Sequence, residues 1–196
     1  MTIQTIDARS TQATSLWLKN YYFIRFAFSA IWVAIAFAMA KNSPPLAAVL
    51  LVAYPAWDAI ANLVDAQRSG GIARNRAQLF NFLVSSLTAA AVAAALTNSI
   101  NSVVFVFAVW AGFAGLLQLA TAVGRWKSFG AQWAMALSGA QSVLAAIFMA
   151  KMAQGPGPVG IISIAPYAAF GAFYFFISAI WLAVRDARKA ALRTTN

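Results

Sequence analysis

Residues 21–66 read YYFIRFAFSAIWVAIAFAMA, then KNSPP, then LAAVLLVAYPAWDAIANLVDA. A helix that crosses a bilayer needs about 20 consecutive apolar residues, and the runs Tyr21–Ala40 and Leu46–Ala66 both reach that length. The break between them carries two prolines, which end a helix and favour a turn. This pattern predicts a hairpin of two transmembrane helices.

The rest of the chain repeats the pattern. Further apolar stretches of membrane-spanning length are Ala77–Thr97, Asn101–Val123, Gln132–Met152 and Gly160–Val184. Of all residues 62% are apolar and 9% charged, whereas a soluble domain carries roughly 25% charged residues. We therefore predict an all-α membrane protein with six transmembrane helices, in which a transmembrane domain (20–185) lies between an N-terminal segment (1–19) and a basic tail (186–196).

The basic residues predict the orientation, because cytoplasmic loops carry an excess of Lys and Arg. Of the 14 Lys and Arg residues, eleven fall in the N-terminal segment, in the loops after the second and fourth helices, and in the tail. On the opposite side are only Lys41 and Lys151, while Arg25 lies within the first helix. Both termini are therefore expected in the cytoplasm.

The net charge of +10 raises the question of a nucleic-acid partner. The basic residues flank the membrane spans, so topology and attraction to anionic lipid headgroups account for them. We expect no nucleic acid and expect membrane lipids as partners. The predicted lipid contacts are Arg68, Arg74, Arg76, Arg125 and Lys127.

The residues that the chain lacks exclude several chemistries. It has no cysteine, no histidine and no glutamate, and its four acids are Asp7, Asp58, Asp65 and Asp186. Thiolate chemistry, disulfides, Cys/His zinc sites and histidine catalysis are excluded, and a carboxylate-rich metal site is not expected. The remaining Ser, Tyr, Lys and Asp residues form no recognisable nucleophile–base pair. We expect no enzyme, no cofactor and no metal.

One glycine motif also fails as a nucleotide site. Residues 155–160, GPGPVG, match the spacing G-x-G-x-x-G. The match follows a membrane helix on the predicted outer side, and its two prolines lack the amide donors that a phosphate would need.

An internal repeat runs through the chain. Residues 29–41 align without gaps on residues 139–151, with six of 13 positions identical and Met-Ala-Lys ending both. The third helix fits the same frame, with Ser85 under Ser29 and Asn98 under Asn42. We predict three repeated helical hairpins, at about 20–67, 77–124 and 132–185. Because each begins inside, an axis along the membrane normal would relate them, unlike the inverted repeats of many transporters.

Three such hairpins, each with a small residue early in its first helix and a short outer turn bearing Pro or Asn, resemble the HdeD-like membrane proteins of bacteria. The best match is QWAMALSGAQSVL at residues 132–144, followed by the Gly/Pro turn and the helix Gly160–Arg185. The resemblance covers the chain from about Tyr21 to Arg185. It implies a six-helix protein of the bacterial inner membrane with a role in acid or stress resistance, and it brings no catalytic residues. The position of Asp58 inside a span is a feature that we cannot assign to this family.

Asp58 marks the candidate site, because an ionisable residue inside a span is costly and is a functional candidate. Helical spacing puts Tyr54, Asn62 and Asp65 on its face, and Arg25 of the first helix is expected to pair with it. Polar residues at similar depth in other helices are Asn81, Ser85, Gln118, Gln141 and Ser178. Such a set indicates either a water-accessible pocket open to the cytoplasm or a structural ion pair with inter-helix hydrogen bonds.

Two functions remain open on this basis. The first is a non-enzymatic HdeD-like bundle that acts in stress tolerance or as a partner within a membrane assembly. Its expected protein partner is a second copy of itself or another membrane protein. The alternative is a small transporter or channel that uses the Asp58/Arg25 site. A water-filled cavity reaching past Asp58 would favour the transporter, and a packed interior would favour the bundle.

Overall fold

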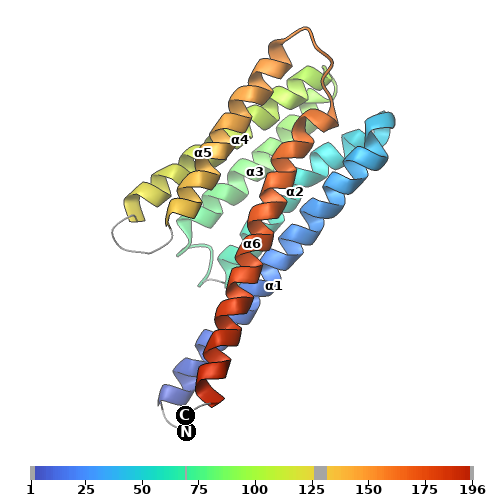
Figure 1. Ribbon diagram of the computed structural model, residues 1–196. Helices are drawn as coiled ribbons and strands as arrows, with labels where there is room; N and C mark the ends of the chain where they lie inside the picture. Colours follow the sequence, from blue (N-terminus) through green and yellow to red (C-terminus); the bar gives the residue numbers. More distant parts are fainter. Residues whose placement is uncertain (1–2, 69, 126–131, 195–196) are drawn as a thin grey trace. The chain divides into compact units, whose positions relative to one another are not determined.

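Six long helices make up the fold. The computed structural model describes residues 3–68, 70–125 and 132–194. Within these ranges lie, in order, α1 (Ile3–Ala38), the short 3-10 helix η1 (Ala40–Asn42), α2 (Pro44–Arg68), α3 (Arg76–Ala95), α4 (Ile100–Arg125), α5 (Gln132–Gln154) and α6 (Ile161–Thr194) (Figure 1). Each of the six α-helices contains a stretch long and apolar enough to cross a membrane. The prediction of six helices of membrane-spanning length is confirmed.

The first and last helices are longer than the spans predicted within them. Helix α1 has 36 residues and α6 has 34, while the stretches of them that are long and apolar enough to cross a membrane are Leu16–Ala38 and Ile161–Arg188. No glycine or proline interrupts the chain before Pro44, and the tail is rich in Ala, Arg and Lys, which favour helix. The segments expected to flank the transmembrane domain therefore continue its outermost helices.

The turn between α2 and α3 depends on two glycines. Gly70 and Gly71 adopt φ angles of 102° and 95°, a left-handed conformation that costs glycine little. The amide of Gly71 donates to the carbonyl of Ala66 over 3.0 Å, which satisfies one of the carbonyls left open at the end of α2. The Gly-Gly pair therefore ends α2 and turns the chain toward α3.

The chain forms two compact units, and the first is residues Met1–Ile31 with Ala168–Asn196. Its α1 and α6 segments run antiparallel, side by side (Figure 1). Aromatic rings join them: the ring centroids of Tyr22 and Phe175 are 6.3 Å apart, and those of Phe26 and Phe176 are 4.8 Å apart.

The second unit, Trp32–Tyr167, holds η1 and the four helices α2 to α5. Helix α2 packs on α3, α3 on α4, and α4 most extensively on α5. Two glycines let α4 and α5 approach closely: a Cβ built on Gly115 would lie 2.6 Å from the Gly139 carbonyl oxygen, and one on Gly139 would lie 2.8 Å from that of Gly115. Small residues at such a crossing are a common way to associate helices in lipid.

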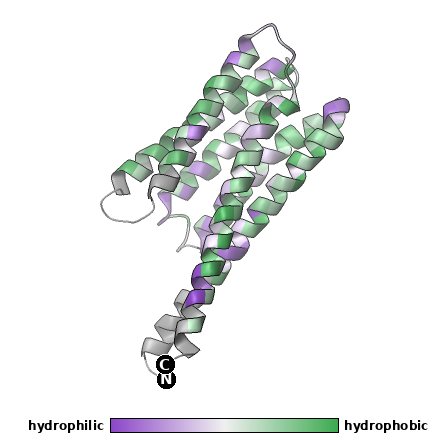
Figure 2. Ribbon diagram, in the orientation of Figure 1, coloured by the Kyte–Doolittle hydropathy of each residue, from purple (hydrophilic) through white to green (hydrophobic). Residues whose placement is uncertain are grey.

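Large apolar side chains cover much of the outer surface of the chain. Leu87, Val123 and Phe148 are 70%, 72% and 65% exposed, which would be costly in water over so wide a surface. Figure 2 shows apolar residues along most of each helix, with hydrophilic residues mainly toward the ends. This surface suits hydrocarbon, and the chain is accordingly a multi-pass membrane protein.

The predicted repeat puts Ser85 and Gly139 at equivalent positions, and both are buried. The superposition of the three hairpins and the cytoplasmic position of both termini stay predictions.

Candidate intramembrane polar site

The candidate site begins on one face of α2. Tyr54, Asp58 and Asn62 are spaced by four residues and share that face; Tyr54 and Asn62 are buried and Asp58 is half-buried. Pro55 has no amide to bond to the carbonyl of Leu51, so the helix lacks one hydrogen bond at this level. The indole of Trp32 donates to the neighbouring carbonyl of Leu50 over 2.8 Å. This bond ties α2 to Trp32 beside its proline.

The carboxyl group of Asp58 accepts hydrogen bonds from two helices. The Asn62 amide donates to Asp58 Oδ2 over 2.9 Å and to the Asp58 backbone carbonyl over 2.8 Å. From α3, the hydroxyl of Ser85 donates to the same Oδ2 over 2.7 Å, a length typical of a good hydroxyl hydrogen bond. One oxygen of Asp58 thus joins α2 to α3 at the level of a membrane span.

A third helix adds a further donor. The indole Nε1 of Trp110, on α4, donates to Ser85 Oγ over 3.3 Å, and Ser85 is only 2% exposed. Hydrogen bonds therefore run from α4 through α3 to α2 and end on the carboxyl group. We call Asp58, Asn62, Ser85 and Trp110 the Asp58 network. Each of its donors has an acceptor within the network, as polar groups in a low-dielectric interior require.

A layer of aromatic rings surrounds Trp110. Its ring lies edge-on to those of Tyr54, Phe107 and Tyr167, with centroids 6.0, 5.8 and 6.1 Å away. Tyr54 in turn contacts Trp32, at 5.0 Å between centroids. Edge-on pairs contribute about 0.5–1.5 kcal/mol each beyond their buried area, so this layer holds the Trp110 indole in its position against Ser85.

A second carboxyl group joins the same two helices. The amide of Gln78, on α3, donates to Asp65 Oδ2 over 3.0 Å. Asp65 follows Asp58 by seven residues, or about two helical turns, so both acids lie on the side of α2 that faces α3. Of the polar stripe predicted on α2, the two acids contact α3, whereas Tyr54 packs against Trp32 and Trp110.

Arg25 belongs to the other unit. Its guanidinium lies over the ring of Phe175, 4.2 Å from the centroid, and donates to the Tyr21 hydroxyl over 2.9 Å. A guanidinium over an aromatic face is held by the ring's negative potential. The ion pair between Arg25 and Asp58 would link the two units and stays a prediction.

Of the two glutamines expected in the site, Gln118 forms a hydrogen bond with α5. Gln118 is exposed on α4, where it accepts a hydrogen bond from Ser138 of α5 at 3.4 Å. It follows Trp110 by eight residues, which rotates it by about 80° around the helix, so it lies on a different side of α4. Gln141 is half-buried on α5. Depth in the membrane was the only criterion for including them, and depth does not specify the side of a helix.

Four of the five basic residues predicted to contact lipid headgroups lie at helix ends or in a turn. Arg68, Arg74 and Arg76 are exposed at the α2–α3 turn. Arg125 ends α4; its side chain and the whole of Lys127 lie outside the described part of the chain.

Sequence reasoning missed Trp32, Gln78 and Trp110. A signal for the two tryptophans was available, since each lies in the middle of a predicted span. Tryptophans of membrane proteins more commonly lie near the ends of spans, in the aromatic belts at the membrane–water interfaces. An indole N–H in hydrocarbon needs an acceptor, so a mid-span tryptophan predicts a polar partner. Gln78 carried no such signal, because a glutamine near a helix end is ordinarily solvated.

Across the described ranges, no three Asp, Glu, His or Cys side chains gather as a metal site would require. Comparisons of the chain with protein-family models, with curated proteins and with solved structures found no match. The function is therefore proposed from the residues, from their geometry and from the resemblance of the hairpin repeat.

Proposed function

We propose that this protein is a non-enzymatic integral membrane protein of the HdeD-like kind. It acts in acid or stress tolerance at a bacterial inner membrane, as a partner within a membrane assembly. The observation that supports the non-enzymatic part is the Asp58 network, in which the intramembrane carboxyl joins three helices through Ser85 and Trp110. Inter-helix hydrogen bonds are a known use of polar side chains in membrane bundles. The physiological role follows from the resemblance of the hairpin repeat.

The proposed orientation places both termini in the cytoplasm, on the basis of eleven Lys and Arg residues against two. The chain has no cysteine, so single cysteines report the sidedness directly. A membrane-impermeant thiol reagent is expected to label Asn42→Cys in intact cells and to label Ala73→Cys only after the cells are opened. The reverse pattern would refute the orientation.

The transporter alternative rests on one observation, namely that Asp58 is half-buried and not fully buried. A carboxyl that carries a proton or cation must be able to ionise, whereas a structural acceptor need only offer an oxygen. Asp58→Asn keeps an oxygen acceptor and removes the acid, so it separates the two functions.

The test is survival at low pH of a strain that lacks the gene and carries a plasmid copy. Under the proposal, the wild-type chain and Asp58→Asn both restore survival, and affinity-tagged chain brings down the same partner proteins in both cases. If deletion leaves survival unchanged, the role in acid tolerance is wrong. If Asp58→Asn is folded and abundant but fails to restore survival, the acid itself is required. That result would contradict a purely structural role for Asp58 and favour the transporter.

A further inference from the structure

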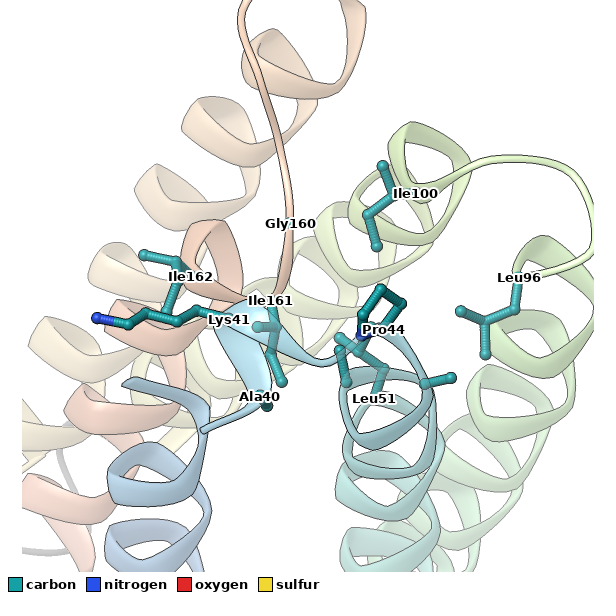
Figure 3. A pocket seen from close by; sticks show the side chains of 11 residues that line it. Ala40, Lys41, Pro44, Leu51, Leu96, Ile100, Gly160, Ile161 and Ile162 are labelled. Atoms are coloured by element: carbon teal, nitrogen blue, oxygen red, sulfur yellow. The ribbon is translucent and has the colours of Figure 1, made fainter. Parts of the chain in front are cut away.

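A pocket of about 360 Å³ lies at one end of the second unit, close to the lower end of the size range of small-molecule sites. It is bounded by η1 and by the turns and helix ends around it: the start of α2, the end of α3, and the starts of α4 and α6. Its lining is apolar apart from Lys41, and includes Ala48, Leu51, Leu96, Ile100 and Ile161 (Figure 3). Asp58 does not line it, so it is separate from the site described above.

The pocket runs from a helix end into the depth of the bundle. Pro44, at its mouth, begins α2, and Leu51, which is fully buried, lies seven residues further along. Seven residues of helix rise by about 10 Å. Since helix ends lie near the membrane surface, the pocket extends from the headgroup level into the level of the hydrocarbon chains, whichever side of the membrane this end faces.

Lys41 is the one charged residue of this lining. In Figure 3 its stem passes beside Ile162 and its ammonium group points away from the apolar side chains. Among the described residues no carboxylate forms an ion pair with it. The side chain thus offers a cation at the mouth of an apolar cavity, an arrangement that long basic side chains adopt at membrane interfaces.

We propose that this pocket binds one hydrocarbon chain of an anionic phospholipid of the bilayer, whose phosphate pairs with Lys41. The apolar lining favours a hydrocarbon chain as the occupant, and the ammonium group of Lys41 favours a headgroup of negative charge. The depth of the pocket favours a lipid over a soluble anion. The inference does not depend on the role in acid tolerance.

The protein contains a second lysine that serves as a matched control for the charge of Lys41. Lys151 aligns with Lys41 in the predicted repeat and is likewise an exposed lysine near a helix end. It is not part of the pocket lining. Neutralising Lys151 therefore removes the same charge from the chain without touching the proposed site.

The experiment is native mass spectrometry of the full chain in a non-ionic detergent, with lysophosphatidylglycerol and lysophosphatidylcholine of the same acyl chain as probes. We expect one equivalent of the anionic lipid to bind about two- to fivefold more tightly than the zwitterionic one, the size of an exposed ion pair. Lys41→Ala abolishes this preference and Lys151→Ala keeps it. Glycerol phosphate, which has no chain, does not compete.

A larger side chain in the cavity tests the proposal that a hydrocarbon chain binds there. Ala48→Phe is expected to weaken binding of both lipids at least tenfold, whereas Ala140→Phe, on an exposed face of α5, leaves binding within twofold. If Ala48→Phe does not fold, the smaller change Ala47→Leu serves in its place, since Ala47 also lines the pocket. Equal binding of the two lipids by the wild-type chain, an equal effect of the two lysine variants, or unchanged binding in a folded pocket-filling variant would each overturn the proposal.

Discussion

The α2–α3 and α4–α5 interfaces associate helices by opposite means. Between α2 and α3, side chains reach across: Ser85 donates to Asp58 and Gln78 donates to Asp65. Between α4 and α5, the two residues at the crossing are glycines, Gly115 and Gly139. Because glycine has no side chain, the two backbones lie against each other there. In lipid the hydrophobic effect does not drive helices together, and both hydrogen bonds and close packing can replace it. One interface depends on particular atoms being present, and the other on particular atoms being absent.

The glycine interface is expected to be the more sensitive of the two. Gly115→Ala puts a Cβ against backbone that cannot move aside alone, so α4 and α5 must separate. Overpacking of this kind costs about 1–3 kcal/mol and occasionally more, and a Cβ only 2.6 Å from a backbone oxygen places this variant at the upper end of that range or beyond it. The measurement is unfolding of the purified chain in mixed micelles with increasing denaturing detergent.

Gly112→Ala is its control on the same helix, because a Cβ there would meet Ala146 Cβ at 3.5 Å, an ordinary contact. This variant is expected to unfold like the wild type, or slightly later because alanine favours helix. Equal losses for Gly112→Ala and Gly115→Ala would mean that the close approach of α4 and α5 is not what stabilises them.

The polar interface is expected to lose about 1–3 kcal/mol when Asp58 is replaced by alanine, since donors on Asn62 and Ser85 are then left in a low-dielectric interior without this acceptor. Asp58→Asn keeps one oxygen and is expected to lose less than half as much in the same unfolding assay. If the two variants are equally destabilised, the negative charge rather than the hydrogen bonds stabilises this interface.

The smallest effect is expected at Asp65. Asp65 and Gln78 are only half-buried and lie toward the helix ends, where water replaces a lost partner. Asp65→Ala is therefore expected to change the free energy of unfolding by about 0.5 kcal/mol or less, the lower end for a hydrogen bond. A loss as large as that of Asp58→Ala would show that depth in the bundle does not set the strength of these bonds.

Much of the fold was predictable because it depends on local composition. A run of about 20 apolar residues predicts a span wherever it occurs, and residues 54, 58 and 62 share a face of α2 because helix geometry fixes it. Which residue of another helix meets Asp58 depends on how each helix is rotated about its axis. Ser85 and Gln118 lie at similar depth, yet only Ser85 is turned toward α2, and composition does not contain that information.

The same reasoning applies to the glycines. Nothing local in the sequence distinguishes Gly115, which lies against Gly139, from Gly112, which lies one turn away in ordinary contact. Likewise the boundaries of α1 and α6 were set too short, because hydropathy marks where a helix enters the membrane and not where the helix ends.

The most direct test of a structural Asp58 is a double-mutant cycle between Asp58 and Ser85. The free energy of unfolding is measured for the wild type, for Asp58→Ala, for Ser85→Ala and for the double variant. Inter-helix hydrogen bonds in a membrane bundle couple by about 0.6 kcal/mol on average and up to about 1.7, and the short bond from Ser85 is expected in the upper part of that range. Losses that add within about 0.3–0.5 kcal/mol, the normal scatter for independent sites, would contradict the conclusion that this carboxyl holds α2 and α3 together.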